Sequence, residues 1–414
     1  MQAWTVPAAP LLPGGQPGLL LRLFDTAQQE LVEVPAPQGT ARMYVCGITP
    51  YDATHVGHAN TYVVFDLLHR LWRDRGLDVN YVQNVTDVDD PLLERAASIG
   101  VAWQDLAEEE TELFRNDMRS LNVLPPRHYV GAVESMPSII RRIAQLQQRG
   151  SVYPADDAEF PDLYFAQAGD PQFGSLSHVT EAEAVELFAE RGGDPDRPGK
   201  KAALDCVIWR LARAGEPAWE SPFGPGRPGW HVECTAIALD YLGPDFDVQG
   251  GGTDLIFPHH EMCAAQARVA TDQPLAKAYV HSAMVGFGGE KMAKSKGNLV
   301  LISELLNDGV DPMAIRLALL SQHYRRDWDW SDDLLSTATQ RLGRWREAFR
   351  LDAGINAEQT IEQMRAALAN DLNAPVGLAA VDAWAGASTT IDADDAEAPA
   401  LVSSACDALL GVRL

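Results

Sequence analysis

The sequence predicts an α/β protein built around a parallel sheet, because strand and helix patterns alternate along the chain. The segment ARMYVCG (41–47) is short and apolar, which indicates a buried strand. Residues 58–75 then carry apolar side chains at a helical period, and DVNYVQNV (78–85) reads as a second strand. A strand, a helix and a strand in this order form a right-handed βαβ unit with parallel strands.

The same alternation returns after a long irregular stretch, so we expect an insertion to split the nucleotide-binding fold. Residues 91–150 look largely helical, residues 151–228 are irregular and rich in Gly, Pro and Asp, and all patterns after residue 300 are helical. The expected segments are an N-terminal extension (1–36), the first half of the nucleotide-binding domain (37–125), an inserted subdomain (126–205), the second half (206–300) and a helical bundle (301–414).

Composition indicates a soluble globular protein. Hydrophobic residues make up 46% and charged residues 22% of the 414 positions, and no run approaches the roughly 18 apolar residues that a membrane span needs. The first residues have no basic n-region, so they are a poor signal peptide, and we expect a cytoplasmic protein with no membrane partner. Five cysteines are too few for a disulfide scaffold in so long a chain, which favours reduced thiols, some of them on a metal.

The charge balance is strongly acidic, with 58 Asp and Glu against 33 Lys and Arg and a net charge of −25. Nucleic-acid affinity depends on basic side chains that displace counterions from phosphates. We therefore expect no nucleic-acid partner, although a local basic groove stays possible.

Three glycine-containing stretches are candidates for contact with phosphates and ribose. HVGH (55–58) opens a helix, where free N–H groups and the helix dipole favour anions. GGEKMAKSKGN (288–298) carries Lys291, Lys294 and Lys296 on a loop, and GGGTD (250–254) follows a strand. The alternative readings are two polar residues at a helix cap and a solvated basic loop.

Several motifs together resemble one family. HVGH and KMAKS resemble the HIGH and KMSKS signatures of the class I aminoacyl-tRNA synthetases, and YVCGITPYDATHVGH, YVQNVTDVDD, GWHVEC, GGGTDLIFPHHE and KMAKSKGN are similar to the cysteinyl branch. The resemblance covers residues 43 to about 300. It implies a class I synthetase-type Rossmann fold with an inserted subdomain and a C-terminal helical bundle.

The resemblance also implies roles for individual residues. His55, His58, Lys291 and Lys294 would be catalytic, with ATP, accompanied by Mg²⁺, as co-substrate. One departure is Ala293, which stands where the family motif has serine. The positions that would bind ATP, the adenylate or cysteine are Cys46, Gly47, Ile48, Thr49, Gly57, Thr61, Asn84, Val85, Thr86, Trp230, Gly252, Thr253, Asp254, Val285 and Ser295.

By the same resemblance, Cys46, Cys234 and His259 would hold one zinc ion, which takes the thiol of substrate cysteine. Taken alone, Cys234 would read as a small buried apolar residue. Cys263, four residues after His259 on one helix face, either completes the zinc sphere or sits back as an apolar residue. We expect His260 to form a local hydrogen bond, and Cys206 and Cys406 to be structural.

Two enzyme classes share this core, and the sequence favours the one that does not act on tRNA. One class charges tRNA with cysteine. The other activates L-cysteine as cysteinyl adenylate and joins it by an amide bond to the amine of glucosaminyl-inositol, with release of AMP and pyrophosphate, in mycothiol biosynthesis. Residues 351–414 contain two basic residues, Arg365 and Arg413, which is a poor tRNA surface. Gln249, ERGGDP (190–195) and SPFGPGRPGWHVEC (221–234) also resemble the ligase.

The expected enzyme is thus a monomeric, ATP-dependent cysteine–amino sugar ligase, with cysteinyl-tRNA synthetase as the alternative. A non-catalytic zinc- or nucleotide-binding paralogue is a third hypothesis, which only Ala293 supports. The amine must be unprotonated to attack, so a base is useful. The candidates are Asp87, Asp89 and Asp90, and nothing in the sequence selects among them. Their alternative role is to cap the helix that follows.

Overall fold

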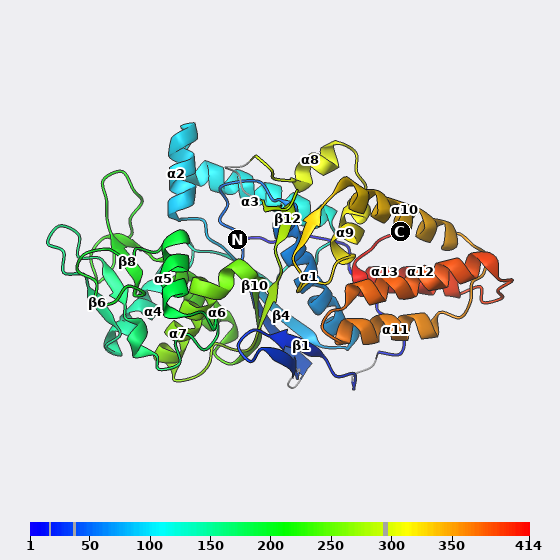
Figure 1. The fold of residues 1–414 in the computed structure, drawn as a ribbon, viewed down its shortest axis with the longest axis horizontal. Coiled ribbons are helices and arrows are strands. Elements are labelled where there is room, and N and C mark those ends of the chain that lie inside the picture. The colour runs from blue at the N-terminus through cyan, green and yellow to red at the C-terminus, as the bar shows by residue number, and fades with distance from the viewer. Residues whose placement is uncertain (16–17, 36–38, 293–296) are drawn as a thin grey trace.

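A five-stranded parallel sheet forms the centre of the molecule (Figure 1). The computed structural model describes residues 1–15, 18–35, 39–292 and 297–414. The strands run in the order β11 (Ala276–Ser282), β10 (Phe246–Gly252), β3 (Thr40–Val45), β4 (Asp78–Val85) and β5 (His128–Gly131). The strand order reverses between β3 and β10. In such doubly wound sheets, ligands bind beyond the carboxyl ends of the strands at this point.

Helices cover both faces of the sheet, as Figure 1 shows. α1 (Val56–Asp74) links β3 to β4 and packs against the C-terminal helices. α6 (Trp230–Leu242) and α7 (Glu261–Thr271) pack on the other face with α4 (Met136–Gln148). The connection from β4 to β5 is made by α2 (Asp90–Ile99) and α3 (Trp103–Ser120), and the turns Thr253–Leu255 and Ile256–His260 lead from β10 into α7.

The inserted part contains a sheet of its own, which differs from the irregular region that the sequence predicts. Its antiparallel strands run in the order β6 (Val152–Pro154), β7 (Leu163–Phe165), β8 (Cys206–Leu211) and β9 (Gly226–Pro228), and α5 (Glu181–Glu190) lies between β7 and β8 in the chain. The boundaries differ too, because β5 belongs to the central sheet and β8 and β9 belong to the inserted one. Strands this short carry no readable period, so tertiary pairing decides their sheet.

The C-terminal part is a helical bundle, as the sequence predicts. It consists of α8 (Ile302–Asn307), α9 (Pro312–Leu320), α10 (Asp332–Ala348), α11 (Glu358–Ala369), α12 (Ala374–Thr390) and α13 (Ala398–Leu410). One exception is β14 (Trp328–Trp330), which pairs with β12 (Val285–Phe287), itself paired with β13 (Glu290–Lys291). Within the described ranges, no helix is long and apolar enough to cross a membrane.

A buried ion network joins the bundle to the sheet domain. Asp66 of α1 accepts hydrogen bonds from Arg70, at 2.6 Å, and from Arg316 of α9, and all three side chains are fully buried. Arg316 also donates to the backbone carbonyls of Leu121 and Leu410. Burial alone would raise the pKa of Asp66, but the two guanidinium charges outweigh it and hold the pKa below its usual value. Bundle and sheet domain therefore share one core and one set of buried charges.

The N-terminal extension forms a hairpin, β1 (Arg22–Asp25) and β2 (Glu30–Glu33), that connects several parts of the fold. The N–H of Thr26 donates to the carbonyl of Tyr279 in β11, and the N–H of Phe24 donates to Asp371 of the bundle. The extension is therefore built into the structure.

Candidate functional site

Two adjoining cavities lie beyond the carboxyl ends of β3 and β10. The smaller one, here called the histidine cavity, has a volume of about 460 Å³ and contains His55 and His58. The larger one, the insertion cavity, has a volume of about 800 Å³ and is walled mainly by the inserted part. Both fall in the range of roughly 300–1,000 Å³ that is typical of small-molecule sites. The residues that line both are Thr49, Tyr51, Trp230, Asp254, Leu255 and Lys291.

Most of the residues that the resemblance selects line the histidine cavity. They are Cys46, Gly47, Ile48, Thr49, His55, Gly57, His58, Thr61, Trp230, Gly252, Asp254, Val285 and Lys291. Asn84, Val85, Thr86 and Thr253 do not line it. Lys294 and Ser295, with Ala293 and Lys296, lie outside the described residues.

The two histidines form a stacked pair at the start of α1. Their ring centroids are 3.9 Å apart, and Nδ1 of His55 accepts a hydrogen bond from the N–H of Gly57. Burial, the larger cause, and the neighbouring His58 together lower the pKa of His55 to about 3. His58 is exposed at the histidine cavity, where desolvation by the surrounding protein lowers its pKa to about 4. Both rings are therefore neutral near pH 7 and can each donate one hydrogen bond to a phosphate.

Asn84 fixes the loop after β3, although it does not line the cavity. Its Oδ1 accepts from the N–H of Gly47 at 2.8 Å, and its Nδ2 donates to Thr86. A Cβ at position 47 would lie 1.6 Å from the backbone oxygen of Asn84, so only glycine fits there. The N–H of Thr86 donates to the carbonyl of Ile48, which adds a second link between the same two loops.

Three side chains gather into a buried donor cluster, as the resemblance implies. Cys46 follows β3, Cys234 lies on α6 and His259 lies in the turn before α7, and their ligand atoms are all within 4.8 Å of one another. Burial raises the pKa of the Cys46 thiol, and Cys234 raises it further, so a nearby cation would be needed to hold Cys46 as a thiolate. Two thiols and one neutral imidazole are the donor set that zinc prefers, so these residues fit the ion.

His259 is held from two sides. Its Nδ1 is 3.0 Å from Nδ1 of His231, and the ring of Trp230 stacks on it with centroids 4.2 Å apart. Burial lowers the pKa of His259, so its ring is neutral. Residues that orient a histidine ligand in this way raise the affinity of metal sites.

The sequence predicts a local hydrogen bond for His260, but its ring partners lie 11, 21 and 214 residues away in the chain, and one of them belongs to the donor cluster. Its Nε2 is 3.2 Å from Sγ of Cys46 and 3.1 Å from Nε2 of Gln249. Its Nδ1 is 2.7 Å from Nε2 of His281, whose Nδ1 is 2.7 Å from Oγ1 of Thr26. A line of buried polar groups thus runs from Cys46 to the N-terminal hairpin.

The remaining cysteines stand outside the cluster. The Sγ of Cys263 is 3.9 Å from Nε2 of His259 and 3.3 Å from the carbonyl oxygen of His231, and Cys263 is not part of the group of three. Cys206 lines the insertion cavity, and Cys406 is buried in the bundle core.

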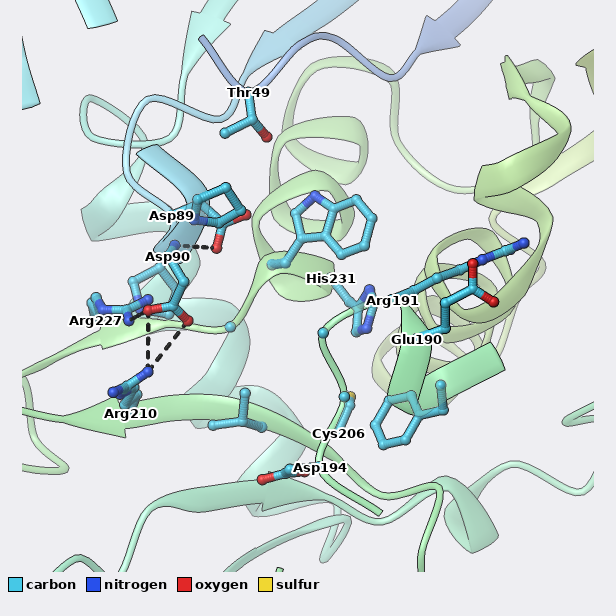
Figure 2. A pocket seen from close by; sticks show the side chains of 18 of the residues that line it. Thr49, Asp89, Asp90, Glu190, Arg191, Asp194, Cys206, Arg210, Arg227 and His231 are labelled. Atoms are coloured by element: carbon cyan, nitrogen blue, oxygen red, sulfur yellow. Dashed lines mark hydrogen bonds and ion pairs between the residues drawn. The ribbon is translucent and has the colours of Figure 1, made fainter. Parts of the chain in front are cut away.

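The insertion cavity has a wall of paired charges, which Figure 2 shows. Asp90 accepts from Arg210 at 3.2 Å and from Arg227, and both arginines also bind Glu216. On the other side, Arg191 of the ERGGDP segment donates to the backbone carbonyls of Asp254 and Phe257. The inserted part therefore contacts the turn that carries His259 of the donor cluster.

Sequence reasoning missed some residues that line the histidine cavity. They are Tyr51, Asp52, Ala53, Tyr62, Leu255, Ala283, Met284, Met292 and Leu299. Tyr62 also donates to the carbonyl of Cys46 at 3.2 Å. Their proximity to the motifs in the chain was the available signal, since all of them lie within four residues of a predicted site residue.

The comparisons with known proteins point to the same family as the motifs. A family model described as "tRNA synthetases class I (C) catalytic domain" matches residues 32–340. The L-cysteine:1D-myo-inositol 2-amino-2-deoxy-alpha-D-glucopyranoside ligase of Kribbella flavida is 60% identical over 416 residues, and that of Thermobispora bispora is 58% identical over 415 residues. Each of these alignments covers 100% of both chains.

Solved structures of low sequence identity share the fold. Mycobacterium tuberculosis methionyl-tRNA synthetase in complex with methionyl-adenylate has a TM-score of 0.65 at 16% identity, over 90% of each chain. A putative arginyl-tRNA synthetase from Campylobacter jejuni has a TM-score of 0.56 at 14% identity, over 91% of this chain and 93% of that one. These likenesses confirm the predicted class I synthetase fold. Taken with the full-length identity to the curated ligases, they show that the chain belongs to the class I (C) tRNA synthetase family, in the branch of the L-cysteine:1D-myo-inositol 2-amino-2-deoxy-alpha-D-glucopyranoside ligases.

Proposed function

We propose that this protein activates L-cysteine with ATP and joins it to the amine of glucosaminyl-inositol, the reaction named for its relatives. One observation carries the proposal: Cys46, a member of the donor cluster, lines the same cavity as His55 and His58. A site that recognises a thiol and a site that binds phosphates therefore share one space, as the synthesis of cysteinyl adenylate requires.

In the first step, a carboxylate oxygen of cysteine attacks the α-phosphorus of ATP, and the bond to the β-phosphate breaks to release pyrophosphate. His55 and His58 donate hydrogen bonds to the phosphates from neutral rings at the N-terminus of α1, which favours anions. Lys291, which lines both cavities, and Lys294 supply positive charge to the leaving pyrophosphate. Mg²⁺ accompanies ATP.

Cys46, Cys234 and His259 would hold a zinc ion, and His231 would orient His259. When bound, zinc supplies a soft Lewis acid that accepts the thiol of cysteine as a ligand, so serine is rejected at the binding step. Asp254, Thr49 and Trp230 lie where the two cavities meet and are placed to orient the aminoacyl group.

In the second step, the sugar amine attacks the carbonyl carbon of the adenylate, an amide bond forms and AMP leaves. We further propose that the enzyme works as a cytoplasmic monomer and does not bind tRNA. The net charge of −25 and the acidic C-terminal bundle support the last point.

The test follows the two half-reactions with the purified protein. Cysteine-dependent exchange of pyrophosphate into ATP should occur without any acceptor, and serine should not replace cysteine. Added glucosaminyl-inositol should then give AMP and the cysteinyl amide, whereas bulk tRNA should give neither AMP nor cysteinyl-tRNA. Charging of tRNA would contradict the proposal, and so would the absence of exchange.

A further inference from the structure

The insertion cavity opens directly onto the histidine cavity. Most of the residues that line the insertion cavity have no role in the proposed synthesis of the adenylate. The two cavities meet at Thr49, Trp230 and Asp254, so a molecule in the insertion cavity would face the end of the adenylate that carries the reactive carbonyl. Its volume of about 800 Å³ is enough for a pair of linked six-membered rings.

The walls of the insertion cavity carry hydrogen-bonding groups suited to a polyol. Arg210 and Arg227 are fixed by Asp90 and Glu216, and each guanidinium has N–H groups beyond those engaged in these pairs. Two further carboxylates of the wall are engaged as well, since Asp194 is paired with Lys200, and Asp162 with Arg197 and Arg213.

Asp89 differs from these carboxylates. It lines the insertion cavity, and its side chain has no salt bridge within the part of the chain that the structure describes. Its Oδ1 accepts the N–H of Asp90 at 2.8 Å as the N-cap of α2. Figure 2 shows Asp89 between Thr49 and the pair of Asp90 with Arg227.

We propose that the insertion cavity is the acceptor site and that Asp89 binds the ammonium group of the amino sugar and accepts its proton. This inference rests on the proposed function. The nitrogen transfers one proton to the Asp89 carboxylate, and its freed electron pair forms the C–N bond at the carbonyl carbon. The bond from that carbon to the phosphate oxygen breaks, AMP leaves with the electron pair, and the second proton of the nitrogen goes to the departing phosphate.

The surroundings of Asp89 suit this role near neutral pH. Burial raises the pKa of Asp89 to about 6, while the N–H of Asp90 and the charge of Arg227 lower it. The other charged or titratable groups that face it are Asp90, Glu94, Tyr51 and Glu233. At pH 7 the carboxylate is charged and can hold a cation, and its pKa is close enough to the pH to accept a proton.

Asp87 supplies a matched control. Burial also raises the pKa of Asp87 to about 6, but its Oδ1 accepts the N–H of Val133 at 2.9 Å and it lines neither cavity. Asp89→Asn keeps the shape of the side chain and the helix cap, because asparagine caps as well as aspartate.

The experiment compares wild type, Asp89→Asn and Asp87→Asn in three assays. Asp89→Asn should keep cysteine-dependent exchange within about twofold and lose about 100-fold in AMP release that depends on glucosaminyl-inositol. It should keep AMP release with hydroxylamine, a small nucleophile that is unprotonated at pH 7.5 and needs no base. In wild type, kcat/KM for the amino sugar should decrease as the pH drops below about 6, and this decrease should be absent in Asp89→Asn.

Asp87→Asn should retain all three activities within a few-fold. Acceptor-dependent AMP release by Asp89→Asn at the wild-type rate would overturn the assignment, and so would an equal loss with hydroxylamine, which would mark a structural role. Failure of the proposed function is seen separately, since wild type would then lack exchange or would transfer cysteine to tRNA.

Discussion

His231 and His259 face one another through their Nδ1 atoms at 3.0 Å, which leaves Nε2 of His259 outside that contact. The variant His231→Phe removes the partner and leaves the donor cluster itself intact. Because such partners fix the orientation of a histidine ligand, we expect about 10- to 100-fold weaker zinc affinity, measured by competition with a chelating dye. His128→Phe, in β5, is the control and should bind zinc as wild type does. Unchanged affinity in His231→Phe would show that the contact does not orient His259.

Removal of one cluster thiol should empty the metal site. In Cys234→Ser we expect zinc content, measured by elemental analysis, to fall from about one ion per chain to below about 0.1, because a hydroxyl is a far poorer ligand for zinc than a thiolate. Cys406→Ala, which removes a thiol in the bundle core, should keep its zinc. Cys263→Ala should keep it too, since Cys263 is not in the group of three. Full zinc content in Cys234→Ser would exclude Cys234 as a ligand.

The loop after β3 should not tolerate a side chain at position 47. A Cβ there would lie 1.6 Å from the backbone oxygen of Asn84, so Gly47→Ala must displace the loop that carries Cys46 and Thr49. A displacement of about 1 Å at reacting groups costs roughly 100-fold in rate, and we expect a loss of at least that size in cysteine-dependent exchange. Gly343→Ala in α10, where a Cβ would meet nothing within 4 Å, should leave exchange unchanged and stabilise the helix by about 0.5–1 kcal/mol.

The buried network should make Arg316 important for stability. Arg316→Met leaves Asp66 with one of its two guanidinium partners and removes the hydrogen-bond donor of two buried backbone carbonyls. We therefore expect a loss of about 3–5 kcal/mol in the free energy of unfolding, measured by urea denaturation. Arg346→Met breaks the half-exposed pair with Asp311 and should cost only ~0–1 kcal/mol. Equal losses in the free energy of unfolding for the two substitutions would show that the buried network stabilises the fold no more than an exposed ion pair does.

The histidines of the HVGH motif should stay neutral throughout the working range. The pKa of His55 is lowered to about 3 and that of His58 to about 4, both mainly by burial, against about 6.5 in an unfolded chain. Because the pKa of each histidine is lower in the folded than in the unfolded protein, its contribution to stability is fully present above the unfolded-state pKa. That contribution is lost as the pH falls toward and through the folded-state pKa. Between pH 5.5 and 8, the ring resonances of ¹³C-labelled His55 and His58 should therefore not titrate. An inflection near pH 6.5 in either resonance would contradict these shifts.

The elements around the motifs could be predicted from the sequence, because each has a strong local pattern. DVNYVQNV has the bounds of β4, and the family resemblance implied the gathering of Cys46, Cys234 and His259 from three separate elements. Residue type and motif context were sufficient there, since each of the three residues lies near the start or the end of a regular element.

Other features had no local signal. β5, β8 and β9 are short, and only their pairing partners decide which sheet they join. Asp66 and Arg70 are polar residues four apart on α1, and no sequence pattern predicts that Arg316 contacts Asp66. Likewise, the choice of Asp89 over Asp87 and Asp90 depends on the structure. Asp89 lines the insertion cavity, whereas Asp87 does not, and Asp90 is paired with two arginines.

The strand order of the central sheet also governs how the protein is assembled on the ribosome. β3 pairs with β4 on one edge and with β10 on the other. β4 is synthesised soon after β3, whereas β10 emerges only after the whole inserted sheet has been made. During that interval the second edge of β3 carries unpaired backbone groups, the kind of surface that chaperones shield in nascent chains. Cys46, at the end of that strand, is translated long before Cys234 and His259, so a metal that needs all three ligands would enter only late in synthesis.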